Sequence, residues 1–426
     1  MKVNLARLNH ILLPATRDER DRLRRSPLFR ALLPLVFLYE ALSVEGRLLA
    51  GMCLVAGVLG LDVSTTDAYL LWAVSASLLT ASLVATQGYA LGGVRLEARA
   101  PERVAVGETA TFTLVLRNDG LRAHGTVRLA GPFLPWDGRY VGASSSVPRI
   151  APASEARAEI RARFVQRGEH HLDPFRAAAL VPLGLTLGPS LRSNACRFVV
   201  VPRIANVARV TTPLGNRHQP GGVAMASKTG ESMDLLGVRQ YRAGDPMRDL
   251  HARSWARTGI PVVREYQQEY FSRIGVVLDT ESADDPDKLE AAISLAAGVV
   301  AHLSRGEALI DLLVVGDHVH DLTLGRSCGF LDQALDLLAC VEPVALPEPA
   351  ALSARLAPFL PRLSCMLLVA CAWDARRSAL AEQLRGFGPG VTTLLVTDTD
   401  TDTDAPAPDV RSVSVGAIAR GERLAL

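Results

Sequence analysis

The chain has 426 residues, enough for two or three domains of ordinary size. Its 46 Lys and Arg residues nearly balance 44 Asp and Glu residues, and the net charge of +2 argues against a dedicated binder of nucleic acid or another polyanion. Because 49% of the residues are hydrophobic and 21% are charged, a wholly disordered chain is excluded.

The six cysteines are expected to be reduced and free. None of them forms a C-x-x-C pair, and no His stands beside them at a zinc-ligand spacing. Residues 222–229 imitate a phosphate-binding loop, but Ser227 replaces its second Gly and no flanking strand and helix are predicted. The sequence therefore predicts no disulfide and no cofactor.

Two apolar segments near the N-terminus predict a transmembrane hairpin over residues 44–91. Residues 48–61 contain no polar side chain, and residues 68–94 contain no charge. The second segment exceeds the roughly 20 apolar residues that cross a bilayer. The first is short and reaches that length only if it extends over residues 44–63, with its charged ends at the interfaces. A buried hairpin of a soluble protein is the less favoured alternative.

Charges flanking the two segments predict their orientation. Residues 1–47 carry nine basic residues against five acidic ones, and Arg95, Arg99 and Arg103 follow the second segment. The turn between the segments, Asp62–Asp67, has two acids and no base. Since basic flanks stay inside, we expect residues 1–43 and everything after the hairpin to be cytoplasmic, with two helices crossing the cell membrane.

Residues 94–203 have the period of β-strands. Phe112, Leu114 and Leu116 alternate with polar residues, and this run ends at the turn residues 118–120. Residues 156–164 alternate between apolar and mostly basic side chains, which is typical of a strand with one solvated face. Shorter strands are expected at 126–130, 176–181 and 196–202. Together they predict a small immunoglobulin-like β-sandwich, and we interpret the basic stripe as its wet face.

Residues 204–273 are expected to form a linker followed by an Arg-rich segment. Seven Arg lie between positions 239 and 273 together with four acids, a mixture that suits paired charges within an irregular segment. Gly244-Asp245-Pro246 predicts a tight turn, and residues 262–266 predict a strand that follows it.

This Arg-rich segment, residues 236–270, resembles the signature of the domain of unknown function 58 family, a bacterial membrane-associated group; we call it the signature segment. The residues that match the family pattern are Arg239, Tyr241, Gly244, Asp245, Arg248, His251, Ala256, Arg257, Gly259, Arg264 and Glu265. Ala252 departs from the pattern, which has Trp after the His. Residues 182–185 and 200–203 are weaker matches, and the order of the domains also resembles the family.

Residues 274–426 alternate between strands and helices. Strands are expected at 274–278, 309–315, 366–371, 391–396 and 410–415, with helices near 286–304, 330–341, 352–360 and 374–386. Asp285 and Pro286 provide the cap and the first residue of the first helix. This alternation predicts a mainly parallel sheet with helices on both faces.

The C-terminal segment resembles a von Willebrand factor A-like domain. In metal-binding members of that family the first strand ends in D-x-S-x-S, whose carboxylate and hydroxyls bind Mg²⁺. Here the corresponding residues are Asp279, Glu281 and Ala283, so both hydroxyls are replaced. Asp284, Asp285 and Asp374 leave another metal geometry open. We favour a degenerate site that holds no metal, with a structural or interaction role for Asp279.

The fold class predicted is therefore an α+β multidomain membrane protein. The resemblance implies a non-enzymatic scaffold in the bacterial inner membrane that acts with a MoxR-type AAA+ ATPase in the assembly or maturation of protein complexes. The alternative is a membrane-anchored hydrolase or metal-dependent enzyme that uses the signature segment, with His251 beside Asp249 and Arg253. No Ser or Cys nucleophile stands in a recognisable elbow for that chemistry, and no basic face with aromatic residues points to nucleic acid.

Overall fold

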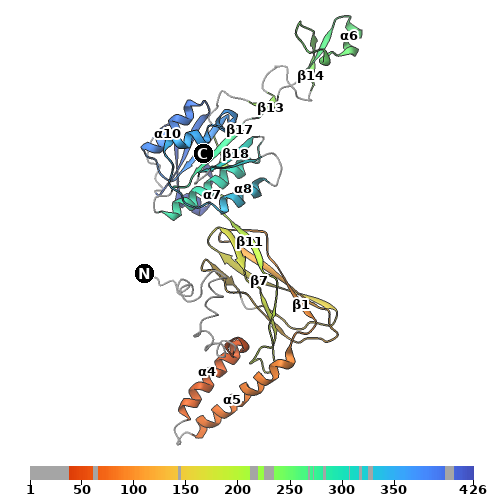
Figure 1. The fold of residues 1–426 in the computed structure, drawn as a ribbon, viewed down its shortest axis with the longest axis vertical. Coiled ribbons are helices and arrows are strands. Elements are labelled where there is room, and N and C mark those ends of the chain that lie inside the picture. The colour runs from red at the N-terminus through yellow and green to blue at the C-terminus, as the bar shows by residue number, and fades with distance from the viewer. Residues whose placement is uncertain are drawn as a thin grey trace. The chain divides into compact units, whose positions relative to one another are not determined.

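Figure 1 shows the fold in a computed structural model, which mixes helices with several sheets and confirms a mixed α and β protein. The chain divides into two compact units, Met1–Val200 and Val201–Leu426. The structure describes residues 38–60, 66–142, 145–211, 219–224, 235–266, 269–271, 273–281, 285–306, 308–315, 319–324, 330–398 and 407–426. Most of the predicted N-terminal segment, most of the predicted turn at 62–67 and Ala283 lie outside these residues.

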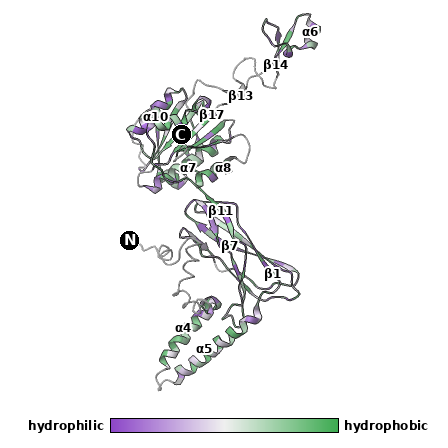
Figure 2. Cartoon of the chain, viewed as in Figure 1, coloured by the Kyte–Doolittle hydropathy of each residue, from purple (hydrophilic) through white to green (hydrophobic). Residues whose placement is uncertain are grey.

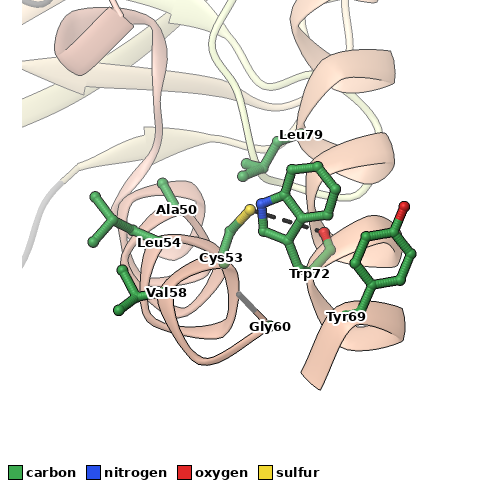
Figure 3. A pocket seen from close by; sticks show the side chains of 9 residues that line it. Ala50, Cys53, Leu54, Val58, Gly60, Tyr69, Trp72 and Leu79 are labelled. Carbon is green, nitrogen blue, oxygen red and sulfur yellow. Dashed lines mark hydrogen bonds between the residues drawn. The ribbon is translucent and has the colours of Figure 1, made fainter. Parts of the chain in front are cut away.

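Two helices that pack against each other open the first unit. Helix α4, Val44–Leu59, begins at Ser43, whose Oγ accepts a hydrogen bond from the Gly46 amide at 2.9 Å. Helix α5, Thr66–Ala85, continues into a short 3-10 helix, η1, at Thr86–Tyr89. Hydrophobic residues line both helices (Figure 2). An apolar groove between them brings Cys53 of α4 next to Trp72 of α5, as Figure 3 shows.

Only one of the two helices has the length of a membrane span. Among the described residues, the helical stretch Asp67–Tyr89 is long and apolar enough to cross a bilayer. Helix α4 has 16 residues and falls short of the roughly 20 that a span requires. The structure therefore has two helices where the hairpin is predicted, and one of them has the composition and length of a transmembrane segment. That both helices cross the membrane stays a prediction.

A loop of the β domain, residues 181–186, joins this helical pair to the sheets; we call it the junction loop. The Ser43 amide donates to the Leu185 carbonyl at 3.0 Å, and Ser43 Oγ donates to the Gly184 carbonyl at 2.5 Å. At the other helix, the buried hydroxyls of Ser82 and Thr186 lie 2.6 Å apart. The loop is thus held between the first turn of α4 and the last turn of α5.

The β domain is built from antiparallel strands that share one core. Its largest sheet has the order β1-β3-β7-β5, and the others have the orders β10-β9-β4-β6 and β2-β11-β8. The strand bounds are β1 Val94–Arg99, β2 Arg103–Ala105, β3 Thr109–Asn118, β4 Val127–Ala130, β5 Gly138–Val141, β6 Ser146–Val147, β7 Ser154–Phe164, β8 Gly168–Leu172, β9 Arg176–Ala179, β10 Leu191–Arg192 and β11 Cys196–Val201. The strands predicted at positions 112–118, 156–164, 126–130, 176–181 and 196–202 are confirmed.

The core of the β domain follows from the alternation along β3 and its partners. Phe112 is fully buried and packs against the rings of Phe175 and Phe198, with centroids 5.4 and 5.5 Å away. These three side chains come from strands or loops of different sheets, so one apolar core holds the sheets together. On the solvent side of β7, Arg157 and Arg161 pair with Glu residues of the same strand, in agreement with a wet face.

The second unit contains a six-stranded sheet in the order β19-β18-β17-β20-β21-β22. All neighbouring strands are parallel except the edge strand β19, which is antiparallel to β18. The strands are β17 Arg273–Asp279, β18 Leu309–Val315, β19 Val319–Leu324, β20 Cys365–Ala370, β21 Gly390–Thr397 and β22 Val410–Ser414. The mainly parallel sheet is therefore confirmed, and the antiparallel edge strand is an addition to the prediction.

Helices cover this sheet as the alternation of elements predicts. The helices are α7 Pro286–Leu303, α8 Phe330–Ala339, α9 Pro349–Leu356, α10 Ala375–Gly386 and α11 Val415–Arg420. Val277 of β17 and Leu368 of β20 pack with Leu352 of α9 and Leu380 of α10 in one core. Helix α7 also packs against β17 and β20, and it begins at the predicted cap, Asp285. A small parallel pair outside the main sheet, β12 Val207–Arg209 with β23 Leu424–Ala425, was not predicted.

The junction loop predicts opposite effects for two glycines of α4. A β-carbon at Gly46 would overlap with the Leu185 carbonyl oxygen, whereas a β-carbon at Gly51 would meet no atom within 4 Å. We expect Gly46→Ala to lower the free energy of unfolding by about 1–3 kcal/mol, as overpacking does, and Gly51→Ala to leave it unchanged or raise it. Thermal melts of the two variants in detergent check this, and equal melting temperatures would contradict it.

A buried His predicts that the stability of the β domain depends on pH. His170 Nε2 lies 2.9 Å from Asp137 Oδ2, and its Nδ1 lies 3.1 Å from the Gly168 carbonyl oxygen. Burial opposes the charged ring, yet Asp137 and this carbonyl raise the pKa of His170 above its ordinary 6.5. The contribution of the pair to stability is therefore full below pH 6.5 and is lost as the pH rises through the raised pKa.

We expect the melting temperature of the wild-type chain to fall over that window and the fall to become shallower in His170→Gln. The exposed neighbour on the same strand, His171, gives the matched control, because His171→Gln should keep the wild-type slope. Parallel slopes in wild type and His170→Gln would mean that the pair does not govern the pH dependence.

Candidate functional site

The C-terminal edge of the parallel sheet is the place where ligands bind in open α/β folds. Strand β17 ends there at Asp279, which is 2% exposed. Its Oδ1 accepts a hydrogen bond from the Glu281 amide at 2.9 Å, and Thr280 Oγ1 donates to the Val315 carbonyl on β18 at 2.7 Å. These bonds hold the turn after β17 and direct both acidic residues toward the edge.

A buried arginine lies among the acidic residues at this edge. Arg377 of α10 is 3% exposed, and its Nε donates to Asp279 Oδ2 at 2.6 Å. Its Nη2 donates to Glu281 Oε2 at 2.8 Å, and its Nη1 donates to Asp374 Oδ2 at 2.7 Å. We call these four residues the arginine cluster. A single guanidinium thus bonds three carboxylates, which come from the end of β17, the turn after it and the start of α10.

The start of α10 explains why Arg377 needs these partners. Asp374 caps the helix, since its Oδ1 accepts a hydrogen bond from the Arg377 amide at 2.9 Å. A cation in the first turn is disfavoured by the helix dipole, so the charge of Arg377 depends on the surrounding carboxylates. Burial opposes the ionised forms, but Asp279 and the other acids raise the pKa of Arg377, and its amide and guanidinium lower the pKa of Asp374.

The arginine cluster does not fit a divalent metal ion. Asp279 and Glu281, two positions of the degenerate motif, both bond the Arg377 guanidinium, which supplies the positive charge among the carboxylates. Asp374 is bonded to the same guanidinium, and Asp285 caps α7 through its own side chain. Within the described part of the chain, no group of His, Cys, Asp and Glu side chains could hold a metal. Ala283 and Asp284 lie outside the described residues.

Within the second unit, the signature segment forms a small subdomain around one β-hairpin. Strand β14, Leu235–Gln240, pairs with β15, Val262–Tyr266, in antiparallel register, with Arg239 opposite Val263. Between them lie a 3-10 turn, η2, at Met247–Asp249 and the helix α6 at Ala252–Thr258. Gly244 and Gly259 adopt φ values of 106° and 71°, which few side-chain-bearing residues tolerate, and Gly259 ends α6.

A bidentate ion pair closes this subdomain. Arg239 Nη1 and Nη2 donate to the two oxygens of Asp245 at 2.7 and 2.8 Å. The Arg242 amide also donates to Asp245, at 2.8 Å, and the Tyr241 amide donates to the Pro261 carbonyl at 2.9 Å. The Arg239 pair and this amide bond lower the pKa of Asp245 to about 2. The pair therefore persists over the whole physiological pH range and links β14 to the turn that follows it.

The remaining signature residues are mostly at the surface. Arg257 and Arg264 are exposed, and Arg248 is largely exposed and lies 3.9 Å from Asp249. The backbone of Glu265 pairs with Gly237, and its side chain lies outside the described residues. The structure therefore brings together Arg239 and Asp245, while it leaves Arg248 and Arg257 apart from this pair.

His251 stands at the start of α6. Its Nδ1 lies 2.7 Å from Ser254 Oγ, and its amide donates to the Val262 carbonyl at 2.8 Å. The contact with Ser254 is between two side chains, and His251 makes no side-chain hydrogen bond that caps the helix. Among the described residues, no carboxylate bonds the ring of His251, so this pair has no third group to orient it.

The signature segment exposes apolar side chains. Met247, Trp255 and Ile260 are all exposed, as is Val238 on β14. Val262 and Val263 are the buried residues that the structure describes in this segment. The segment therefore has almost no core of its own and presents much of its apolar surface outward.

Sequence reasoning missed two features. Arg377 has a detectable signal, because it is a basic residue in the first turn of a predicted helix and follows Asp374, a residue type that caps helices, by three positions. The junction loop, residues 181–186, had no signal beyond its weak match to the family. Its role depends on contacts with α4 and α5, more than 90 residues earlier in the chain.

Comparisons with known proteins add little to these observations. No family model and no curated protein matches the chain. Among solved structures, native alpha-2-macroglobulin from Escherichia coli, from domain MG7 to its C-terminus, is 19% identical over 35% of this chain and 20% of that one, with a TM-score of 0.21. The CARDB domain of the PF1109 protein from Pyrococcus furiosus is 15% identical over 25% of this chain and 87% of that one, with a TM-score of 0.18. Scores this low carry no argument about fold or function.

The arginine cluster predicts a large loss of stability when its cation is removed. Arg377→Ala leaves the buried Asp279 without its partner, which should cost about 3–5 kcal/mol of the free energy of unfolding. Arg385 on the same helix pairs with Asp409 at 3.2 Å near the surface, so Arg385→Ala should cost about 0–1 kcal/mol. Denaturant titrations of both variants check this. Similar losses of unfolding free energy would show that the cluster contributes no more to stability than the surface pair does.

The same cluster predicts weak binding of divalent cations. Because the Arg377 guanidinium already bonds Asp279, calorimetric titration of the full chain with MgCl₂ should show no heat in the range of ~10⁻⁷–10⁻⁵ M that is typical of sensor-type calcium sites. The control is Asp279→Asn, titrated in parallel. A heat in the wild-type chain that disappears in Asp279→Asn would contradict this expectation.

Proposed function

We propose that this protein is a membrane-anchored, non-enzymatic interaction protein of the domain of unknown function 58 family. In this proposal the second unit is a von Willebrand factor A-like domain, and the protein acts with a MoxR-type AAA+ ATPase in the assembly or maturation of protein complexes. The observation that carries the proposal is the surface of the signature segment, which combines exposed apolar side chains with a rigid internal ion pair.

The exposed residues of that segment are of the type that dominates protein interfaces. Trp is enriched among the residues that carry most of the binding energy, and Met adapts to irregular partner surfaces. Trp255 and Met247 both lie on short elements between β14 and β15, whose geometry the Arg239–Asp245 pair restrains. A restrained backbone reduces the conformational entropy that binding would otherwise cost. These features favour a docking surface over a packed structural segment.

The arginine cluster supports an interaction role for the second unit. The guanidinium of Arg377 holds the end of β17 and the start of α10 together without a metal ion. The edge of the sheet where α/β proteins bind ligands is therefore already organised by side chains of the chain itself. A partner that docks at this edge would meet a preformed surface.

The membrane anchor rests on the stretch Asp67–Tyr89, which has spanning length and composition. We propose that α4 crosses the bilayer together with α5 and that both soluble units face the cytoplasm, as the basic flanks favour. A reporter fused after Leu426 should then be active in the cytoplasm, and its activity on the outer face would contradict this topology.

The central experiment is copurification of the detergent-solubilised full chain with a MoxR-type ATPase, with and without nucleotide. Trp255→Ala should reduce the amount of captured ATPase at least tenfold, since interface tryptophans cost about 2 kcal/mol or more when truncated. Phe387, an exposed aromatic residue that follows α10, provides the matched control, and Phe387→Ala should bind like wild type. Equal capture by all three chains would argue against docking through the signature segment.

The contact between His251 and Ser254 keeps a hydrolase as the second candidate, because a Ser hydroxyl 2.7 Å from a His ring nitrogen is also the first requirement of an activated nucleophile. The two functions differ in what His251→Ala does. If the protein acts only by interaction, a His251→Ala variant that still binds the ATPase should keep its cellular function. A variant that folds and binds the ATPase but has lost all cellular function would favour chemistry at His251.

A further inference from the structure

The junction loop lies at the depth of the apolar helix rather than beyond its end. Thr186 Oγ1 both contacts Ser82 Oγ at 2.6 Å and approaches the Ser82 carbonyl oxygen at 3.1 Å. Ser82 is seven residues before the end of the stretch Asp67–Tyr89. At a helical rise of 1.5 Å per residue, this places Thr186 about 10 Å inside that end.

The other helix places the loop at the same level. The Leu185 carbonyl accepts from the Ser43 amide at the first residue before α4, and the Leu187 amide donates to the Ala41 carbonyl at 2.8 Å. The Gly46 backbone approaches Leu185 so closely that no side chain fits between them. The loop is therefore fixed to both helices near the ends that adjoin the β domain.

Leu183 stands out of this fixed loop. Its side chain is 71% exposed, and its φ of 75° is a conformation that leucine rarely adopts. The loop is closed around it by two bonds, from the Val181 amide to the Thr186 carbonyl and from the Gly184 amide to the Val181 carbonyl, both at 3.0 Å. The strained backbone thus holds a large apolar side chain in an exposed position.

A second exposed leucine lies at the same end of the β domain. Leu121 is 96% exposed and belongs to the turn after β3. This turn contacts the chain just after the apolar stretch, since the Asp119 amide donates to the Gly93 carbonyl at 2.9 Å. Leu121 and Leu183 are the most exposed large apolar residues of the described β domain.

Arginines surround the exposed turn. Arg95 and Arg117 share the single carboxylate of Asp119, at 3.4 and 2.9 Å, and Arg122 beside Leu121 is also exposed. In this turn and the residues beside it, these three basic side chains outnumber the single carboxylate of Asp119 that two of them share. Leucine tips with a basic rim are complementary to a bilayer surface that carries anionic headgroups.

We propose that this end of the β domain rests on the bilayer, with Leu183 and Leu121 inserted into the boundary between headgroups and acyl chains. This inference rests on the membrane anchor of the proposed function and adds to it a lipid contact made by the β domain itself. The contact holds the β domain at a defined position on the membrane. Without it, the position of the domain would depend only on the bonds between the junction loop and the two helices.

The test introduces the photoreactive residue p-benzoylphenylalanine, one position at a time, into the full chain reconstituted in vesicles of phosphatidylethanolamine and phosphatidylglycerol. The test positions are Leu183 and Leu121, and Leu70 within α5 reports the anchor. Val165, 56% exposed, is the matched control. It follows β7 at the far end of the sheet, because the register pairs Asn118 with Ser154 at the near end and Thr109 with Arg163 at the other, roughly 30 Å away.

We expect lipid adducts after irradiation at positions 183, 121 and 70, with at least tenfold less at position 165. Adducts at position 70 without adducts at 183 and 121 would overturn the lipid contact and leave the anchor intact. Loss of adducts at all positions would overturn both. An adduct yield at position 165 equal to those at 183 and 121 would also overturn the proposal. If the chain substituted at the strained position 183 does not fold, position 121 decides the outcome.

Discussion

A buried guanidinium must be surrounded by acceptors, and this requirement organises the second unit. Arg377 has to enter the protein because α10 packs on the sheet, and it remains charged at any physiological pH. Three carboxylates meet that charge, and each comes from a different piece of backbone: Asp279 from the end of β17, Glu281 from the following turn and Asp374 from the helix cap. The cluster therefore links the end of the strand, the turn after it and the start of the helix at the edge of the sheet.

The same principle appears on a smaller scale in the other parts of the protein. In the signature segment, the Arg239–Asp245 pair takes the place of the apolar core that a unit of this size cannot build. In the β domain, Asp137 and His170 are hydrogen-bonded to each other, and the His170 ring stacks against Phe198 of the aromatic core. A paired charge thus supports the signature segment, which has almost no apolar core, and another adds to the apolar core that holds the sheets of the β domain together.

Local patterns predicted most of the elements. The alternation from Phe112 to Leu116, the apolar run that ends at Asp279 and the cap at Asp285 each depend on side chains close together in the chain, so their structure could be predicted from the sequence. A long second helix could likewise be predicted, because residues 68–94 contain no charge. The antiparallel edge strand β19 was not, because its direction depends on which neighbour it pairs with, and pairing is not encoded within a short stretch.

The sequence by itself determined the kinds of elements, the apolar helix that could span a membrane and the replacement of the two motif hydroxyls by Glu281 and Ala283, since each of these follows from composition and spacing. Only the tertiary structure decided which residues meet. It brought Arg377 to Asp279 across 98 positions and Thr186 to Ser82 across 104. Contacts at such separations arise when packing brings distant elements together, and that packing is a property of the whole folded chain rather than of any short segment.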